Sequence, residues 1–146
     1  MAVKNMVKTT APALASSAER TPKILETVVD TAADNVAQND IVLTHYIPPF
    51  HRLMGVLLAV QTVEGGVATA DVGIYSDAGV TPVDADGFLD GANLNAATLV
   101  HSAETAAELA DKGYVAPATG AYIGVLAVNA LDAAVFSLKA EIQNWG

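Results

Sequence analysis

The sequence contains no cysteine. This absence excludes a disulfide framework, a thiolate metal site and a cysteine nucleophile. The chain also lacks any apolar run of the roughly 18–20 residues that a membrane-spanning helix needs. Its longest uninterrupted apolar runs are Leu53–Val60 and Ala121–Val128, and both contain glycine. The N-terminus has no apolar segment followed by a cleavage site. We therefore expect no membrane partner and assembly in a cytoplasm.

Charged and aromatic residues are also scarce. Charged residues make up 16% of the chain, against about 25% in a typical globular domain. Hydrophobic residues make up 52%, much of it alanine and valine, and aromatic residues only 5%. Small apolar side chains suit close packing, and an oligomer would ease the shortage of ionic groups that can cover an exposed surface. At 146 residues the chain has the length of one ordinary domain.

The few charges are distributed unevenly. The first 23 residues contain four cations and one carboxylate, which gives a net charge of +3, and these cations are Lys4, Lys8, Arg20 and Lys23. Residues 24–146 contain three cations and fifteen carboxylates, a net charge of −12. Residues 1–23 also lack a hydrophobic period, so we interpret them as an extended basic arm, ordered only against a partner, on an acidic body at 24–146. Such a body repels nucleic acid, which we do not expect as a partner.

Six runs of β-branched and apolar residues predict strands. They are Ile24–Thr31, Ile41–Ile47, Phe50–Val63, Val67–Tyr75, Ala121–Val128 and Phe136–Ile142. Pro48-Pro49 ends the second run, because proline cannot donate to a sheet ladder, and Gly55 marks an expected bulge or bend in the third run. The turn signal Glu64-Gly65-Gly66 joins the third run to the fourth.

The fourth and sixth runs have the clearest strand pattern. In Val67–Tyr75, alanine, valine and isoleucine at every second position predict one buried face. Phe136–Ile142 alternates in the same way between apolar and polar side chains. Ala121–Val128 is apolar almost throughout, so we expect burial on both of its faces. We also expect these last two strands to pack as neighbours in the core, with one edge of the domain facing a second copy.

Two segments lack a strand pattern. Residues 76–93 are rich in aspartate and glycine and predict a loop. Ala103–Lys112 has a helical composition and is followed by Gly113, a suitable C-cap, so it predicts one short helix. The number and spacing of the strands favour a mainly β fold, a β-sandwich of jelly-roll-like or Greek-key type with one short helix and an extended N-terminal arm. The choice between the two connectivities stays open.

Two groups of residues have side chains of the types that can serve as metal ligands. Asp84 and Asp86 lie near two further carboxylates, Asp77 and Asp90, but no EF-hand starts at Asp84 because its sixth and twelfth positions are leucine and asparagine. Turn formation by aspartate and glycine is the favoured interpretation. His45, His51 and Arg52 flank the Pro-Pro corner, but no third ligand has a suitable spacing. We therefore predict no metal and no cofactor, with His45 as a half-buried residue bonded to the backbone.

The sequence has no recognisable catalytic motif. It contains no G-x-S-x-G, no Walker loop and no G-x-G-x-x-G, and nothing selects a carboxylate pair for acid–base chemistry. We therefore predict that the protein is not an enzyme. Aromatic side chains at strand ends often anchor protein contacts, and the candidates are Tyr46, Tyr75, Tyr114, Tyr122 and Trp145.

Two segments carry a resemblance to known proteins. ATADVGIYSDAG, followed by an acidic stretch and LDGANL, and the terminal GAYIGVLAVNALDAAVFSLKAEI are similar in texture to small bacteriophage virion proteins. In particular, the chain resembles the capsid decoration (cement) proteins of tailed phages over roughly residues 24–146. This resemblance has no signature residue, so no functional residue is transferred with it. It implies a subunit, often of a homotrimer, that lies on the outside of the shell, bridges major capsid proteins and resists internal DNA pressure.

Features of the sequence itself, taken with this role, suggest where partners bind. The arm, with its four cations Lys4, Lys8, Arg20 and Lys23, is the expected binding element for the major capsid protein, and Trp145 is expected at a subunit or capsid boundary. The alternatives are a phage tail, neck or fibre-associated structural protein and a carbohydrate-binding or adhesion module. Few aromatic residues and the lack of a secretion signal argue against the second alternative.

Overall fold

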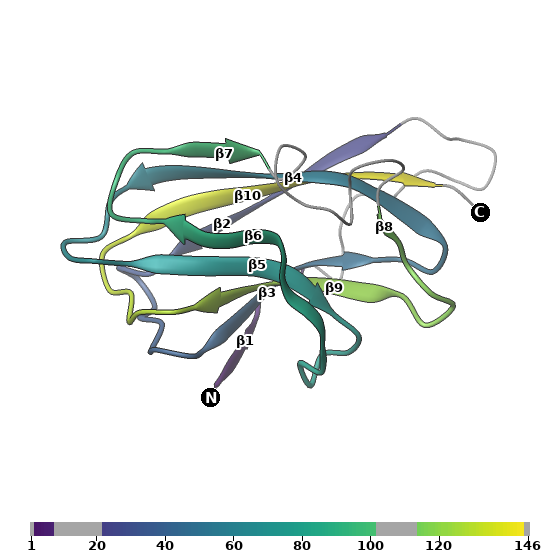
Figure 1. Ribbon diagram of the computed structural model, residues 1–146, viewed down its shortest axis with the longest axis horizontal. Coiled ribbons are helices and arrows are strands. Elements are labelled where there is room, and N and C mark those ends of the chain that lie inside the picture. Colours follow the sequence, from purple (N-terminus) through teal and green to yellow (C-terminus); the bar gives the residue numbers. More distant parts are fainter. Residues whose placement is uncertain (1, 8–21, 102–113, 145–146) are drawn as a thin grey trace.

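The computed structural model describes residues 2–7, 22–101 and 114–144, which form ten strands in two facing sheets (Figure 1). The strands are β1 (Val3–Asn5), β2 (Lys23–Asp30), β3 (Ile41–Ile47), β4 (His51–Thr62), β5 (Thr69–Tyr75), β6 (Pro82–Asn93), β7 (Leu99–His101), β8 (Tyr114–Val115), β9 (Ala121–Ala127) and β10 (Val135–Asn144). The predicted β-sandwich is confirmed. The helix expected at Ala103–Lys112 lies outside the described residues. Within them, no helix is long and apolar enough to cross a membrane.

The strand order defines the two sheets. The β2 sheet has the order β2-β10-β4-β7, with β8 also paired to β4, and it is the upper sheet in Figure 1. The β3 sheet has the order β1-β3-β9-β5-β6. The turn Glu64-Gly65-Gly66 therefore carries the chain across the sandwich from β4 to β5, and these two strands do not pair as a hairpin. The ladder between β4 and β10 is irregular where Leu53 and Gly55 meet Ile142 and Glu141, close to the bulge expected at Gly55.

The main core lies between the sheets. The side chains predicted to point inward from the runs Val67–Tyr75 and Phe136–Ile142 are all at most 1% exposed, and they are Ala68, Ala70, Val72, Ile74, Phe136, Leu138, Ala140 and Ile142. The strand β9 is buried on both faces, as expected. The expectation that β9 and β10 pack side by side is wrong, because the chain crosses from one sheet to the other between them, and they meet only across the core.

A second apolar cluster covers the outer face of the β3 sheet. Its buried members are Ile41, Leu43, Tyr75 and Val80, with Val7 and Tyr122 among the side chains packed against them. Two directly paired glycines, Gly73 and Gly124, make room for it. A side chain at Gly124 would overlap the ring of Tyr75, and one at Gly73 would overlap the backbone of Asp84 and Ala85. The central strands of this sheet are therefore covered on both sides.

The strand β6 corrects the prediction of a loop at residues 76–93. Its pairing with β5 has three irregularities, and it is an edge strand with no neighbour on its other side among the described residues. The aspartates and glycines of this segment interrupt the ladder without abolishing it, because an edge strand tolerates bulges that a central strand does not. The first half of β6 crosses over Gly73 and so covers Tyr75.

The carboxylate of Glu64 ties two crossing loops together. Its Oε2 accepts backbone N–H groups of Asp132, Ala133 and Ala134 at 3.2, 3.1 and 2.9 Å. Burial opposes ionisation of this group, but the hydrogen bonds outweigh burial and lower the pKa of Glu64. Hydrogen bonding and the negative charge of Glu64 in turn raise the pKa of Asp132. The ionised Glu64 therefore fixes the β4–β5 turn against the β9–β10 loop.

We predict that Glu64→Gln lowers the free energy of unfolding at pH 7 by about 1–3 kcal/mol, because charge-assisted hydrogen bonds are replaced by weaker ones. The lowered pKa means that the contribution of Glu64 is complete above its ordinary value of 4.5 and is lost as the pH falls through the folded-state pKa. Urea unfolding between pH 3 and pH 7 measures both effects. Asp132→Asn keeps the backbone donor and serves as the control, with no loss of stability expected.

We predict that Tyr75→Phe raises the free energy of unfolding by about 1 kcal/mol, because the buried hydroxyl of Tyr75 has no hydrogen-bond partner among the described residues. Burial, and to a smaller extent the charges of Asp71 and Asp86, raise the pKa of Tyr75 to about 12. Chemical denaturation of the two proteins at pH 7 provides the measurement. A less stable variant would mean that the hydroxyl is satisfied by a bound water.

Candidate functional site: the proline end of the sandwich

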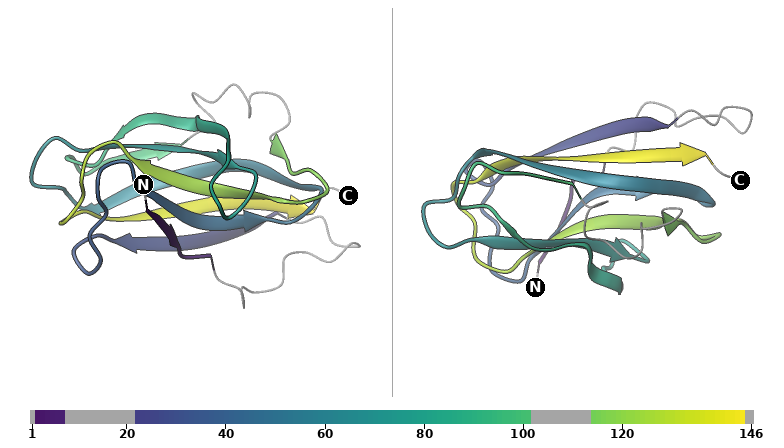
Figure 2. Two further views of the ribbon diagram at one scale, coloured as in Figure 1. Left: turned by 90° about the horizontal axis from the view of Figure 1, so that it is seen from below. Right: turned by 45° about the horizontal axis from the view of Figure 1, so that its top comes forward.

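Several segments that are distant in the sequence meet at one end of the sandwich. The strand β3 ends here in the turn Pro48–His51, and β8 pairs with the start of β4. The last described residue of β10, Asn144, pairs with His51, and Ile142 pairs with Lys23 at the start of β2. We call this region the proline end, and it is the end at which C is marked in Figures 1 and 2.

The turn at the proline end has an unusual residue in its third position. The N–H of His51 donates to the carbonyl oxygen of Pro48 at 3.1 Å, so Pro49 and Phe50 are the central residues of the turn. Phe50 has a φ of 62°. Proline followed by a residue with positive φ is the pattern of a type II turn, which favours glycine or asparagine at that position. The chain has phenylalanine there instead.

Hydrogen bonds attach this turn to β8. The N–H of Phe50 donates to the carbonyl oxygen of Ala116 at 3.0 Å. The N–H of Ala116 in turn donates to the carbonyl oxygen of His51 at 2.9 Å. Phe50 is 53% exposed and Val115 is 40% exposed. The turn is therefore rigid and presents apolar side chains to solvent.

Three of the tyrosines predicted as contact residues lie near this end. Tyr46 of β3 and Tyr122 of β9 are half-buried and face each other with ring centroids 5.0 Å apart. Tyr114 of β8 is half-buried and packs against the core. Tyr75 is only 1% exposed, so the expectation that it contacts a partner is wrong. Trp145 lies outside the described residues.

The two described cations of the predicted arm, Lys4 and Lys23, lie apart from each other. Val3–Asn5 pairs in parallel with β3, so this part of residues 1–23 belongs to the sheet. The Nζ of Lys4 lies 2.8 Å from the Oδ1 of Asp34, and Lys23 begins β2 at the proline end. Lys8 and Arg20 lie outside the described residues. The structure therefore places Lys4 and Lys23 in different parts of the body.

The histidines have structural partners. The Nε2 of His45 lies 2.9 Å from the carbonyl oxygen of Leu25, and its Nδ1 lies 3.0 Å from the Oγ1 of Thr44. His45 is only 5% exposed, more buried than the half-buried position predicted, and its backbone partner is confirmed. Its ring links β3 to β2 where the two sheets meet. The Nδ1 of His51 lies 3.1 Å from the carbonyl oxygen of Pro49, within the turn.

The acidic segment also has a structural role. The Oδ1 of Asp77 accepts the N–H of Thr81 at 3.2 Å, and hydrogen bonds from Thr81 lower the pKa of Asp77. Asp84, Asp86 and Asp90 belong to the edge strand β6. Among residues 2–7, 22–101 and 114–144, no group of three or more histidines and carboxylates is arranged to hold a metal ion.

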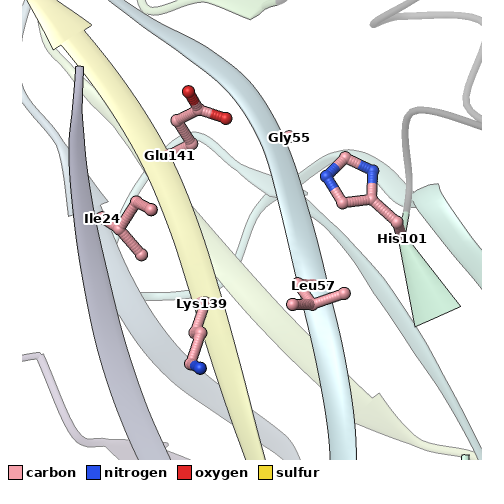
Figure 3. Close-up of a pocket in the computed structure, with 6 residues that line it drawn as sticks. All are labelled: Ile24, Gly55, Leu57, His101, Lys139 and Glu141. Atoms are coloured by element: carbon pink, nitrogen blue, oxygen red, sulfur yellow. The ribbon is translucent and has the colours of Figure 1, made fainter. Parts of the chain in front are cut away.

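A groove lies on the outer face of the β2 sheet (Figure 3). Its lining residues are Ile24 of β2, Gly55 and Leu57 of β4, His101 of β7, and Lys139 and Glu141 of β10. The volume is about 100 Å³, whereas small-molecule sites occupy roughly 300–1,000 Å³. The Nζ of Lys139 is 3.6 Å from the carboxylate of Glu26. The groove is therefore too small for a typical substrate.

Comparisons with known proteins identify the fold at the level of a class. No protein-family model and no curated protein matches the chain. Two solved phage capsid structures contain chains with this sandwich. A chain of the capsid of Ralstonia phage GP4 is 16% identical with a TM-score of 0.63, over 96% of this chain and 97% of that chain. A chain of the cyanophage Pam1 capsid asymmetric unit is 13% identical with a TM-score of 0.61, over 94% of both chains. At these identities the likeness is one of fold.

The exposure of Phe50 and Val115 was not predicted from the sequence. Phe50 was assigned to the start of a strand because an apolar run begins there, and Val115 was assigned no role. The signal for Phe50 was present, since proline at the second position of a turn places the next residue at its tip. Val115 has no such signal, because its neighbour in space, Arg52, is distant in the sequence.

We predict that exhaustive dialysis against EDTA changes the unfolding temperature by less than about 2 °C, because the acidic residues of the described part serve turns and an edge strand. The comparison is made by scanning calorimetry with and without added calcium. A large decrease that calcium alone restores would contradict this prediction, and Asp84→Asn and Asp86→Asn would then locate the site.

Proposed function

We propose that this chain is a structural protein of a tailed-phage virion and, within the virion, a capsid decoration protein that binds the outer shell and bridges adjacent major capsid proteins. The observation that carries the proposal is the likeness of nearly the whole chain to chains from two phage capsid structures, which covers 94–97% of each chain. Neither comparison assigns a catalytic activity, and the proposal includes none.

The strand order supports this assignment. Eight of the strands have the order β2-β10-β4-β7 in one sheet and β3-β9-β5-β6 in the other, which is jelly-roll connectivity. Viral capsid domains use this architecture, although lectins and cupins share it. The fold is therefore one that capsid proteins use, and the capsid likeness of the whole chain favours this role among them.

The proline end is the part of the molecule that we propose to face the shell. It presents Phe50 and Val115 to solvent. It is also where Lys23 leads into β2 and where β10 ends at Asn144, so residues 20 and 145 adjoin it in the sequence. Arg20, Lys23 and Trp145, together with Lys8, remain our proposed contacts for the major capsid protein or a subunit boundary.

Self-association is proposed through the β2 sheet. Its outer face has three exposed apolar side chains, Ile24, Val28 and Leu99, which are 69%, 42% and 70% exposed. The strand β2 lies at the edge of this sheet, and an exposed edge strand is a template for pairing with another chain. A homotrimer that covers this face would match the resemblance to decoration proteins.

We predict that the purified protein sediments with DNA-free shells assembled from the major capsid protein of the same phage, and not with purified tails. Cosedimentation at increasing protein concentration gives a saturable curve, and equilibrium sedimentation of the free protein gives its mass, expected to be three times 14.9 kDa. Binding to tails and not to shells would support the tail, neck or fibre alternative. A monomer at every concentration would contradict the trimer.

A further inference from the structure

Among the described residues, three residues other than glycine have a positive φ, and the backbone strain is compensated differently in each of them. They are Asn39, Phe50 and Val80, with φ of 69°, 62° and 61°. Asparagine tolerates this left-handed conformation better than most residues. Val80 is a strained residue, but its side chain is 95% buried in the second apolar cluster, so packing compensates for the strain. Phe50 has the same backbone conformation and leaves 53% of its side chain in solvent.

The surroundings of Phe50 hold it in this position. Two prolines precede it, hydrogen bonds attach the turn to Ala116, and the N–H of His51 closes the turn on Pro48. A turn whose backbone is already fixed by hydrogen bonds loses little backbone entropy when it binds a partner. Strained residues that the fold does not need are concentrated at functional sites. Phe50 therefore combines strain, rigidity and an exposed aromatic ring.

We propose that Phe50 is an aromatic anchor that inserts into an apolar pocket of the protein shell on which this chain is mounted. The inference deepens the proposed function and rests on it. Buried aromatic anchors at the centre of an interface supply much of the binding energy of protein complexes. Val115 pairs with Arg52 of β4, and the next residue, Ala116, is hydrogen-bonded to the turn. Val115 therefore extends the apolar surface around the anchor.

The shell suits this anchor better than a second copy of the chain does. The groove on the β2 sheet of a second copy is lined by Lys139, Glu141 and His101 as well as by Ile24, Gly55 and Leu57, and a phenyl ring that entered it would remove the three polar groups from water. Two proposed partner contacts are also close to the proline end. Lys23 lies there at the start of β2, and Trp145 follows Asn144, the last described residue of β10, in the sequence. An apolar pocket on another protein is therefore the occupant that we assign to the ring of Phe50.

The test uses Phe50→Gly and Phe50→Tyr in the full chain. Glycine adopts a φ of 62° without strain, so Phe50→Gly should unfold at the same or a higher temperature and yet bind assembled shells at least tenfold more weakly. Phe50→Tyr keeps an aromatic ring and should bind within about threefold of the unaltered protein. Val67→Gly is the matched control, because Val67 is 84% exposed at the opposite end of the sandwich, and its affinity should not change.

The outcomes separate the anchor from the proposed function. If the unaltered protein does not bind shells, the proposed function fails and the anchor fails with it. If it binds, and Phe50→Gly is folded and binds equally well, only the anchor is wrong. A variant that loses self-association in equilibrium sedimentation while keeping its shell affinity would assign Phe50 to a second copy and overturn the proposal. Phe50→Asn, which also tolerates positive φ, replaces the glycine variant if that protein does not fold.

Discussion

Burial of the β3 sheet on both of its faces is the constraint on which the rest of the structure depends. One face packs against the β2 sheet, and the other is covered by the cluster around Tyr75 and by the first half of β6. The opposed pair Gly73 and Gly124 makes this second layer possible, because no other residue leaves space for the Tyr75 ring and the β6 backbone. The β3 sheet therefore has little surface left for a partner.

Because the β3 sheet is covered on both faces, the surfaces left for a partner are the outer face of the β2 sheet and the ends of the sandwich. The outer face of the β2 sheet has no covering layer among the described residues, and its apolar side chains Ile24, Val28 and Leu99 are exposed. The proline end presents Phe50 and Val115. At the opposite end, the carboxylate of Glu64 is used internally to join the β4–β5 turn to the β9–β10 loop. A protein that must contact both its own copies and a different protein requires two such surfaces.

The sequence predicted those parts of the fold that depend on local alternation. The strands β5 and β10 follow from it because each has one face in the core, and β3 follows from its branched residues. Strand pairing did not follow, because β10 lies between β2 and β4, which are far from it in the sequence. The strand β6 was missed because its aspartates and glycines are turn formers, and only its position at a sheet edge makes them acceptable.

In the candidate site too, the local features could be predicted from the sequence, but their arrangement in space could not. The Pro-Pro corner, the tyrosines Tyr46 and Tyr122 and the start of β2 were all recognised as separate features. Their convergence at one end is a property of the sheet order, which places Lys23, His51 and Asn144 side by side. The strain of Phe50 is a property of backbone geometry, and residue type alone argues against it, since phenylalanine rarely occurs at such a position.

The position of β10 has a consequence for biosynthesis. The strand β10 pairs with both β2 and β4, so until residues 135–144 have been synthesised β2 has no partner in its sheet and β4 has only β7 and β8. Domains whose strands pair in sequence order can begin to assemble during translation, but this β2 sheet can close only after β10 has been synthesised. A chain without β10 leaves one edge of β2 and one edge of β4 open, and open strand edges are sites of aggregation.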